Sequence, residues 1–181
     1  NNISEYLKLL LLIKENDLFN GVTKSVPPLN FFFKKFNTFN NPFFSFVKLN
    51  SIISPKAKVL HLAYDYGQLD VLLSLHESQR KIDSFIADEE KRAVAKTNYI
   101  VKKRIIRYLE TKEEFENNNY EVVLISDKKQ EVNTKICQRS NTVILINSSN
   151  LKDEITAFGF DIDIESENLI VLKKKDHEKA V

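Results

Sequence analysis

One glycine and one acidic residue have the spacing of a site that holds a nucleoside-containing ligand. Gly67 ends the segment 59–67, and Asp88 follows it twenty-one residues later. At the end of a parallel strand, glycine leaves room for a ligand and adopts positive φ without strain. An acidic residue at the end of the next strand can accept the hydrogens of both ribose hydroxyls. The pair therefore predicts a nucleotide-type binding site at one edge of a parallel sheet.

Other residues capable of chemistry do not form a recognisable motif. Ser126-Asp127 lacks the flanking glycines of a hydrolase nucleophile turn, and Cys137 is expected to be a small packing residue. Three histidines have no metal-binding spacing: His61, His76 and His177. Within its apolar strand, His61 is expected to be a hydrogen-bonded core histidine. The sequence thus predicts no metal site and identifies no catalytic residue.

The composition is that of an ordinary globular protein. The chain has 181 residues, of which 43% are hydrophobic and 29% are charged, and its net charge is +2. This balance provides no general attraction to nucleic acid or to anionic membranes. A single cysteine fits a reducing compartment, and no apolar run is long enough to span a membrane. We expect a cytoplasmic protein without an export signal, a membrane span or a nucleic-acid partner.

Residues 1–54 differ in composition from the rest of the chain. An apolar pattern predicts a helix that ends near Lys14, and Pro27-Pro28 interrupts any helix that follows. Eight phenylalanines then lie between Phe31 and Phe46. Two interpretations remain open for them. They either form short helices that pack on the main sheet, or they form a lid or a surface for a protein partner or a second copy of the chain.

Strands and helices alternate regularly from residue 55 onward. Apolar segments predict strands at 58–62, 105–109, 120–126 and 142–147, and alternation of apolar and polar residues predicts one at 82–86. Two further strands, 161–164 and 168–173, are separated by a short polar turn and predict a hairpin. Helical patterns occupy 69–75, 89–102, 131–138 and 150–157, the last capped by Ser149 or Asn150. This order predicts an α/β fold with a doubly wound, mostly parallel sheet and a C-terminal antiparallel hairpin strand.

The chain is expected to have three parts. Residues 1–54 form an N-terminal helical, Phe-rich segment packed on the core, 55–175 form a Rossmann-like domain, and 176–181 form a tail.

The order of elements over residues 56–174 resembles the class I S-adenosylmethionine-dependent methyltransferases. Segment 59–67 is similar to the first motif of that family, in which a strand ending in an acid and a hydrophobe precedes three alternating glycines. On this alignment His61 stands in place of the acid. Ala63 and Asp65 stand in place of the first two glycines, and Gly67 keeps the third.

The resemblance continues beyond the first motif. Segment 85–90 is similar to the second strand of the family and its ribose-binding acid, which is Asp88 here. Glu110 lies near the end of the third strand, where the family often has a residue that contacts the adenine. Segment 120–127 is similar to the fourth strand, whose end commonly faces the methyl donor. The hairpin from 160 to 173 resembles the reversed last strand of the family.

This resemblance implies S-adenosylmethionine as the cofactor. The contacts that it implies come from five residues: Tyr64, Asp65, Gly67, Asp88 and Asp127. Two functions follow from it and stay open. The chain is either a methyltransferase of unknown substrate, with cofactor binding retained or weakened, or a non-catalytic methyltransferase-like module that acts in assembly or as a scaffold. The missing glycines favour the second function, and the order of elements favours the first.

Overall fold

The computed structural model describes residues 49–64, 66–67, 69–70, 73–74, 79–97, 106–126, 134–166 and 168–175. The predicted N-terminal helix, the Phe-rich segment and the C-terminal tail lie outside these residues. Two of the five predicted cofactor contacts, Asp65 and Asp127, also lie outside them.

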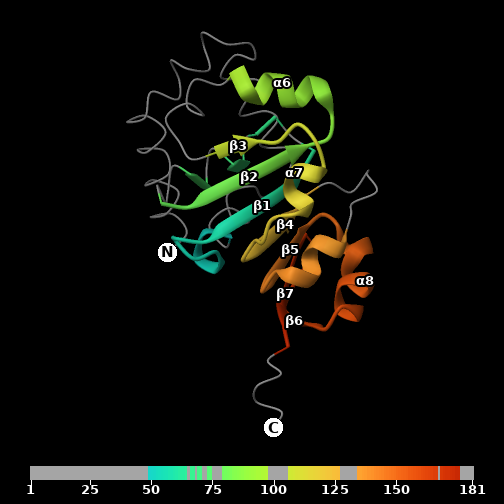
Figure 1. Ribbon diagram of the computed structural model, residues 1–181. Coiled ribbons are helices and arrows are strands. Elements are labelled where there is room, and N and C mark those ends of the chain that lie inside the picture. Colours follow the sequence, from blue (N-terminus) through green and yellow to red (C-terminus); the bar gives the residue numbers. More distant parts are fainter. Residues whose placement is uncertain are drawn as a thin grey trace.

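Seven strands form one sheet in the order β3-β2-β1-β4-β5-β7-β6 (Figure 1). Strands β1 to β5 are parallel, whereas β7 is antiparallel to both β5 and β6. The sheet confirms the predicted fold class. Its strands are β1 (Lys58–Ala63), β2 (Lys81–Ile86), β3 (Ile106–Tyr108), β4 (Val122–Ile125), β5 (Thr142–Ile146), β6 (Phe160–Glu165) and β7 (Leu169–Lys174).

The helices that connect the strands differ in part from the predicted ones. Described residues 69–70 and 73–74 are helical, as expected. The predicted helix 131–138 is instead a 3₁₀ helix, η2 (Thr134–Arg139), within the described residues. The sequence did not predict α7 (Glu113–Glu116). Three further helices are α6 (Glu89–Thr97), η3 (Ser149–Leu151) and α8 (Lys152–Ala157).

Two apolar layers cover the two faces of the sheet. One layer joins alternate strand residues such as Val59 and Ala63 to Leu73 and to Ala95 of α6. The other joins the intervening strand residues to Phe115 of α7 and to residues of η2 and α8. In Figure 1, α6 accordingly lies apart from α7 and α8. All four residues of β4 are buried, which fits a central parallel strand with helices on both sides.

A buried arginine joins residues 49–54 to this core. Arg80 is 1% exposed, and its guanidinium donates to the carbonyl oxygens of Ile53 at 2.8 Å and Leu73 at 3.1 Å. It also donates to the side-chain oxygen of Asn50 at 3.0 Å. Carbonyls at the ends of helices lack partners within the helix, so a cation placed there satisfies them. Arg80 therefore attaches residues 49–54, which precede β1, to the rest of the core.

The terminal hairpin places an irregular strand at the sheet edge. Gly159, with φ of +96°, precedes β6, and its backbone N–H donates to the carbonyl of Thr156 at 3.0 Å. This geometry ends α8 in the way a glycine after a helix usually does. The register of β6 against β7 then shifts between Ile162 and Ile164.

Among the described residues, no helix is long and apolar enough to cross a membrane.

Candidate functional site

The carboxyl ends of the parallel strands gather most of the described residues that the sequence selected. Tyr64 follows β1, Asp88 follows β2 by one residue, and Glu110 follows β3 by one residue. Because β1 to β4 are parallel, these ends lie at the same edge of the sheet. Ligands of open α/β sheets bind at that edge, where the strand order reverses. In this sheet the order reverses between β1 and β4.

Asp88 caps α6. Its Oδ1 accepts the backbone N–H of Lys91 at 3.0 Å, and its carbonyl accepts the N–H of Arg92 at 2.9 Å. Asp88 is therefore the N-cap residue, and the negative charge also lies at the positive end of the helix. Within the described part of the chain, no hydrogen bond reaches Oδ2. The cap uses one carboxylate oxygen and leaves the other for a hydroxyl of a bound ligand.

Lys91 links Asp88 to the turn that follows β1. Its Nζ lies 3.5 Å from the centre of the Tyr64 ring and 5.5 Å from the centre of the Tyr66 ring. The same nitrogen donates to the carbonyl oxygen of Tyr64 at 3.5 Å. A cation over an aromatic face is attracted by the negative charge of the ring face. Lys91 therefore supplies a positive charge beside the predicted ribose-binding acid.

Gly67 is needed for packing as well as for its backbone conformation. Its φ is +84°, and a Cβ at this position would overlap the hydroxyl of Tyr108 and lie 3.2 Å from Cβ of Ala95. Of the three glycines in a dinucleotide-binding turn, the third allows such close packing between helix and strand. Gly67 stands in this third position. Ala63, which stands in the first, is an ordinary residue of β1.

Glu110 is held by two cations of α6. It forms ion pairs with Lys96 and with Arg92, the latter at 3.4 Å. The Arg92 side chain also donates to the carbonyl oxygen of Ile86, at the end of β2. Glu110 is 54% exposed, so solvent screens these pairs. They orient Glu110 toward α6 and contribute little to stability.

His61 is the predicted core histidine, and both of its ring nitrogens have partners. The residue is fully buried, with Nδ1 2.7 Å from Oδ1 of Asp70 and Nε2 2.6 Å from Oγ of Ser126. Asp70 is also fully buried, whereas Ser126 is partly exposed after β4. Sequence reasoning had not linked these residues, because Asp70 is 9 and Ser126 is 65 positions away. A buried histidine was the only signal that such partners exist.

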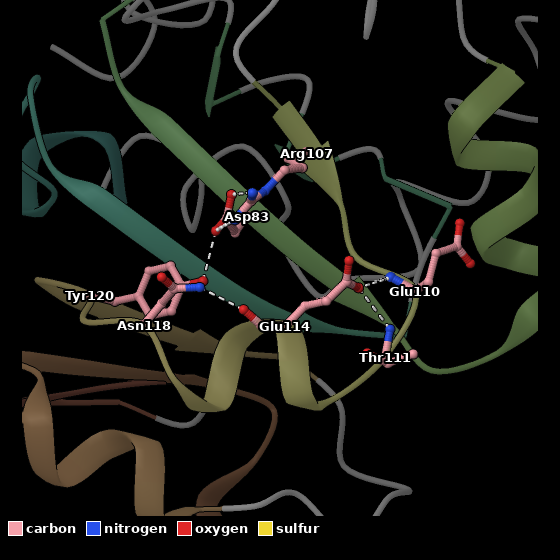
Figure 2. A network of polar contacts seen from close by, with 7 residues as sticks. All are labelled: Asp83, Arg107, Glu110, Thr111, Glu114, Asn118 and Tyr120. Carbon is pink, nitrogen blue, oxygen red and sulfur yellow. Dashed lines mark hydrogen bonds and ion pairs between the residues drawn. The ribbon is translucent and has the colours of Figure 1, made fainter.

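A second polar network lies nearer the amino ends of the strands (Figure 2). Asp83 of β2 accepts from Nε of Arg107 at 3.2 Å, from Nη2 at 2.8 Å, and from the Tyr120 hydroxyl at 2.7 Å. Burial, and then the hydrogen bond to Asp83, raise the pKa of Tyr120 above its ordinary value. The hydrogen bond to Asp83 likewise raises the pKa of Arg107. These contacts tie β2, β3 and β4 together beneath the candidate site.

Figure 2 also shows the hydrogen bonds at the two ends of α7. Oε2 of Glu114 accepts the backbone N–H groups of Glu110 at 2.5 Å and Thr111 at 2.9 Å. The Asn118 amide donates to the Glu114 carbonyl at 2.6 Å and closes the other end. The short helix thus fixes the loop that carries Glu110.

The described residues contain no group of three or more His, Cys, Asp or Glu side chains that could hold a metal ion. Lys91 is one residue of this edge that sequence reasoning missed. Its position three residues after Asp88 was the available signal, since the third helical residue donates to an N-cap side chain.

Comparison with known proteins finds similarity in structure alone. No protein-family model and no curated protein matches the sequence. TehB from Haemophilus influenzae superposes with a TM-score of 0.55 at 16% identity, covering 73% of this chain and 62% of TehB. TrmK from M. capricolum, solved with S-adenosyl-homocysteine, gives 0.51 at 15% identity, covering 74% of this chain and 69% of TrmK. A TehB-like SAM-dependent methyltransferase from Corynebacterium glutamicum gives 0.52 at 10% identity, covering 72% and 86%.

These similarities and the strand order show the fold of class I methyltransferases, as the sequence resemblance implied. The chain spans 62% of the length of TehB.

Proposed function

We propose that the chain binds S-adenosylmethionine at the carboxyl edge of its sheet and acts as a methyltransferase. The observation that carries the proposal is the place of Asp88. In a sheet of methyltransferase order, this acid follows β2 and uses only one oxygen to cap α6. The other oxygen suits a ribose hydroxyl, since a carboxylate accepts two or more hydrogen bonds. TrmK, solved with S-adenosyl-homocysteine, adds support through its similar fold.

Five residues would hold the cofactor, as the family resemblance implies. Asp88 would accept from the ribose, and Gly67 would keep the turn closely packed. Tyr64, Asp65 and Asp127 would line the remainder of the site. Lys91 lies between Tyr64 and Asp88, so its ammonium would neutralise part of the negative charge there. When bound, the cofactor supplies an electrophilic methyl group, and the protein contributes mainly by positioning the acceptor.

Calorimetric titration with S-adenosyl-homocysteine tests the proposal directly. We expect saturable binding to the wild-type chain. Replacing Asp88 with Ala removes both the helix cap and the ribose acceptor, and is expected to weaken binding. Asp88→Ser separates these two roles, because serine caps helices as well as aspartate does. A hydrogen bond to a charged group contributes about 1.5–3 kcal/mol, so we expect Asp88→Ser to weaken binding by about 10- to 100-fold.

The same titration distinguishes the alternative function. If the wild-type chain gives no heat at millimolar ligand, the proposal is wrong and a non-catalytic role in assembly becomes the better interpretation. If Asp88→Ser binds as tightly as wild type, the cofactor does not use this carboxylate. Glu89→Ala is the matched control, since it removes the neighbouring acid and leaves the Asp88 cap in place. It should bind normally.

A further inference from the structure

When the imidazole of His61 is neutral, its two hydrogen bonds have one consistent direction. A carboxylate only accepts hydrogen bonds, so the hydrogen shared with Asp70 belongs to Nδ1 of His61. The other nitrogen, Nε2, then carries a lone pair and accepts the hydroxyl hydrogen of Ser126 at 2.6 Å. The imidazole is therefore oriented to take a proton from Ser126, while Asp70 stabilises the positive charge that would form.

Such a cluster is costly to bury. His61 and Asp70 are both fully buried, and Oδ2 of Asp70 has no hydrogen-bond partner among the described residues. An acidic group in this environment loses hydration that one hydrogen bond does not replace. The buried neighbours of His61 in β1 are apolar, so a polar side chain at this position is not explained by the packing of the strand. Polar groups held at such a cost are often functional ones.

The cluster leads from the interior to the edge where ligands bind. His61 lies on β1 and Ser126 directly follows β4, and these two strands are neighbours at the point where the strand order reverses. The backbone N–H of Ser126 donates to the Leu62 carbonyl at 3.1 Å, so the strand pairing fixes the position of the residue. Of the three residues, only Ser126 is partly exposed.

We propose that Ser126 is a nucleophile, activated by His61 as general base with Asp70 as the positioning residue, and that it attacks acyl esters. An acceptor hydroxyl, a base within hydrogen-bond reach and a third group that orients the base are the diagnostic parts of such a site. These parts recur on unrelated folds and are recognised by geometry. The proposal does not depend on S-adenosylmethionine binding.

The reaction follows from the hydrogen bonds. Oγ of Ser126 forms a bond to the ester carbonyl carbon as its proton passes to Nε2 of His61. The carbon–oxygen bond to the leaving alcohol then breaks, and His61 returns the proton to that alcohol. Water hydrolyses the resulting acyl-serine by the same route, with His61 first accepting and then returning a proton.

Labelling with an alkyl fluorophosphonate tests the proposal without a known substrate. Oγ would displace fluoride from phosphorus, and intact mass with peptide mapping would locate the adduct. We expect a single adduct, on Ser126. General-base catalysis contributes about 10²- to 10⁴-fold, so His61→Gln should slow the labelling by at least about 100-fold. Asp70→Asn should slow it strongly as well. Ser140→Ala is the control, because the Ser140 hydroxyl instead donates to the Cys137 carbonyl, and should label at the wild-type rate.

Variants at buried positions can fail to fold, so a second measurement, the pH dependence of labelling, uses the wild-type protein alone. With His61 as the base, the labelling rate should rise with pH and then reach a plateau once the imidazole is neutral. A serine that merely packs in the core would react slowly and without a plateau. The proposal is overturned if wild-type Ser126 stays unlabelled, if its rate shows no plateau, or if a folded His61→Gln variant labels at the wild-type rate.

Discussion

The hydroxyl group of Tyr108 occupies the space into which a side chain on Gly67 would have to extend. Gly67 also has a φ of +84°, which residues other than glycine rarely adopt. Two independent effects thus oppose any larger residue here. We expect Gly67→Ala to lower the free energy of unfolding by about 3 kcal/mol, measured by urea denaturation.

Gly159→Ala separates the two effects. Gly159 has a φ of +96°, but a Cβ there meets no atom within 4 Å. This variant should lose only the conformational part, about 1 kcal/mol. Tyr108→Phe should recover part of the stability of Gly67→Ala and none of that of Gly159→Ala. Equal losses at both glycines would show that Tyr108 does not crowd Gly67.

The cap made by Asp88 has a measurable effect on stability apart from any ligand. Without ligand, Asp88→Ala should lower the free energy of unfolding by about 1 kcal/mol, because the N–H of Lys91 loses its acceptor. Asp88→Ser should restore most of this loss. Thermal and urea unfolding of the three proteins check the order. An Asp88→Ala variant as stable as wild type would show that the Asp88 side chain does not stabilise α6.

Tyr120 predicts how stability changes at alkaline pH. Its pKa is raised by burial and by the hydrogen bond to Asp83. The unfolded chain therefore releases this proton at a lower pH than the folded chain. The contribution of Tyr120 is complete below the ordinary phenol pKa of about 10 and is lost as pH rises toward the folded pKa. We expect unfolding free energies to fall above about pH 10, and to fall less steeply in Tyr120→Phe.

The same variant should lose stability at neutral pH. Removing the hydroxyl removes a hydrogen bond of 2.7 Å to Asp83, which Arg107 still contacts. We expect a loss of about 1.5 kcal/mol at pH 7, since the acceptor is charged. A pH dependence identical to wild type would contradict the assignment of the alkaline loss to Tyr120.

Cys137 should be unreactive in the folded protein. The residue is fully buried, and burial raises the pKa of its thiol to about 12. The thiolate is the reactive form, so iodoacetamide at pH 8 should modify the unfolded chain rapidly and the native chain only through unfolding. Mass spectrometry of samples with and without urea checks this. Fast modification of the native protein would mean that the η2 region opens readily.

Much of the fold could be predicted from the sequence because β1, β4 and β5 are largely apolar runs, and β2 mixes apolar and polar residues as a strand commonly does. Short elements were less predictable. In α7 only Phe115 is buried, so no periodic pattern marks the helix. The capping prediction for 150–157 was wrong, since η3 precedes α8 and neither helix has a side-chain cap.

The residues of the candidate site could be predicted where their role depends on a neighbouring helix or turn in the sequence. Asp88 lies next to a helix that needs a cap, and Gly67 lies in the turn after β1, so both could be selected from spacing. The ring contact between Lys91 and Tyr64 depends on how α6 packs against that turn. The bond from His61 to Ser126 depends on the register of β1 against β4. Neither relationship has a signature in a single sequence.

The irregular strand β6 has a consequence for how copies of this protein meet in concentrated solution. An open sheet edge invites a further strand and, with it, aggregation. Here the register shift at Ile162/Ile164 interrupts the regular ladder. Asp161 and Asp163 stand on the same strand, beside lysines of β7 and the residue that follows it. A second β6 strand would bring like charges together beside this irregular ladder, which disfavours self-association at this edge even though Ile162 is 41% exposed.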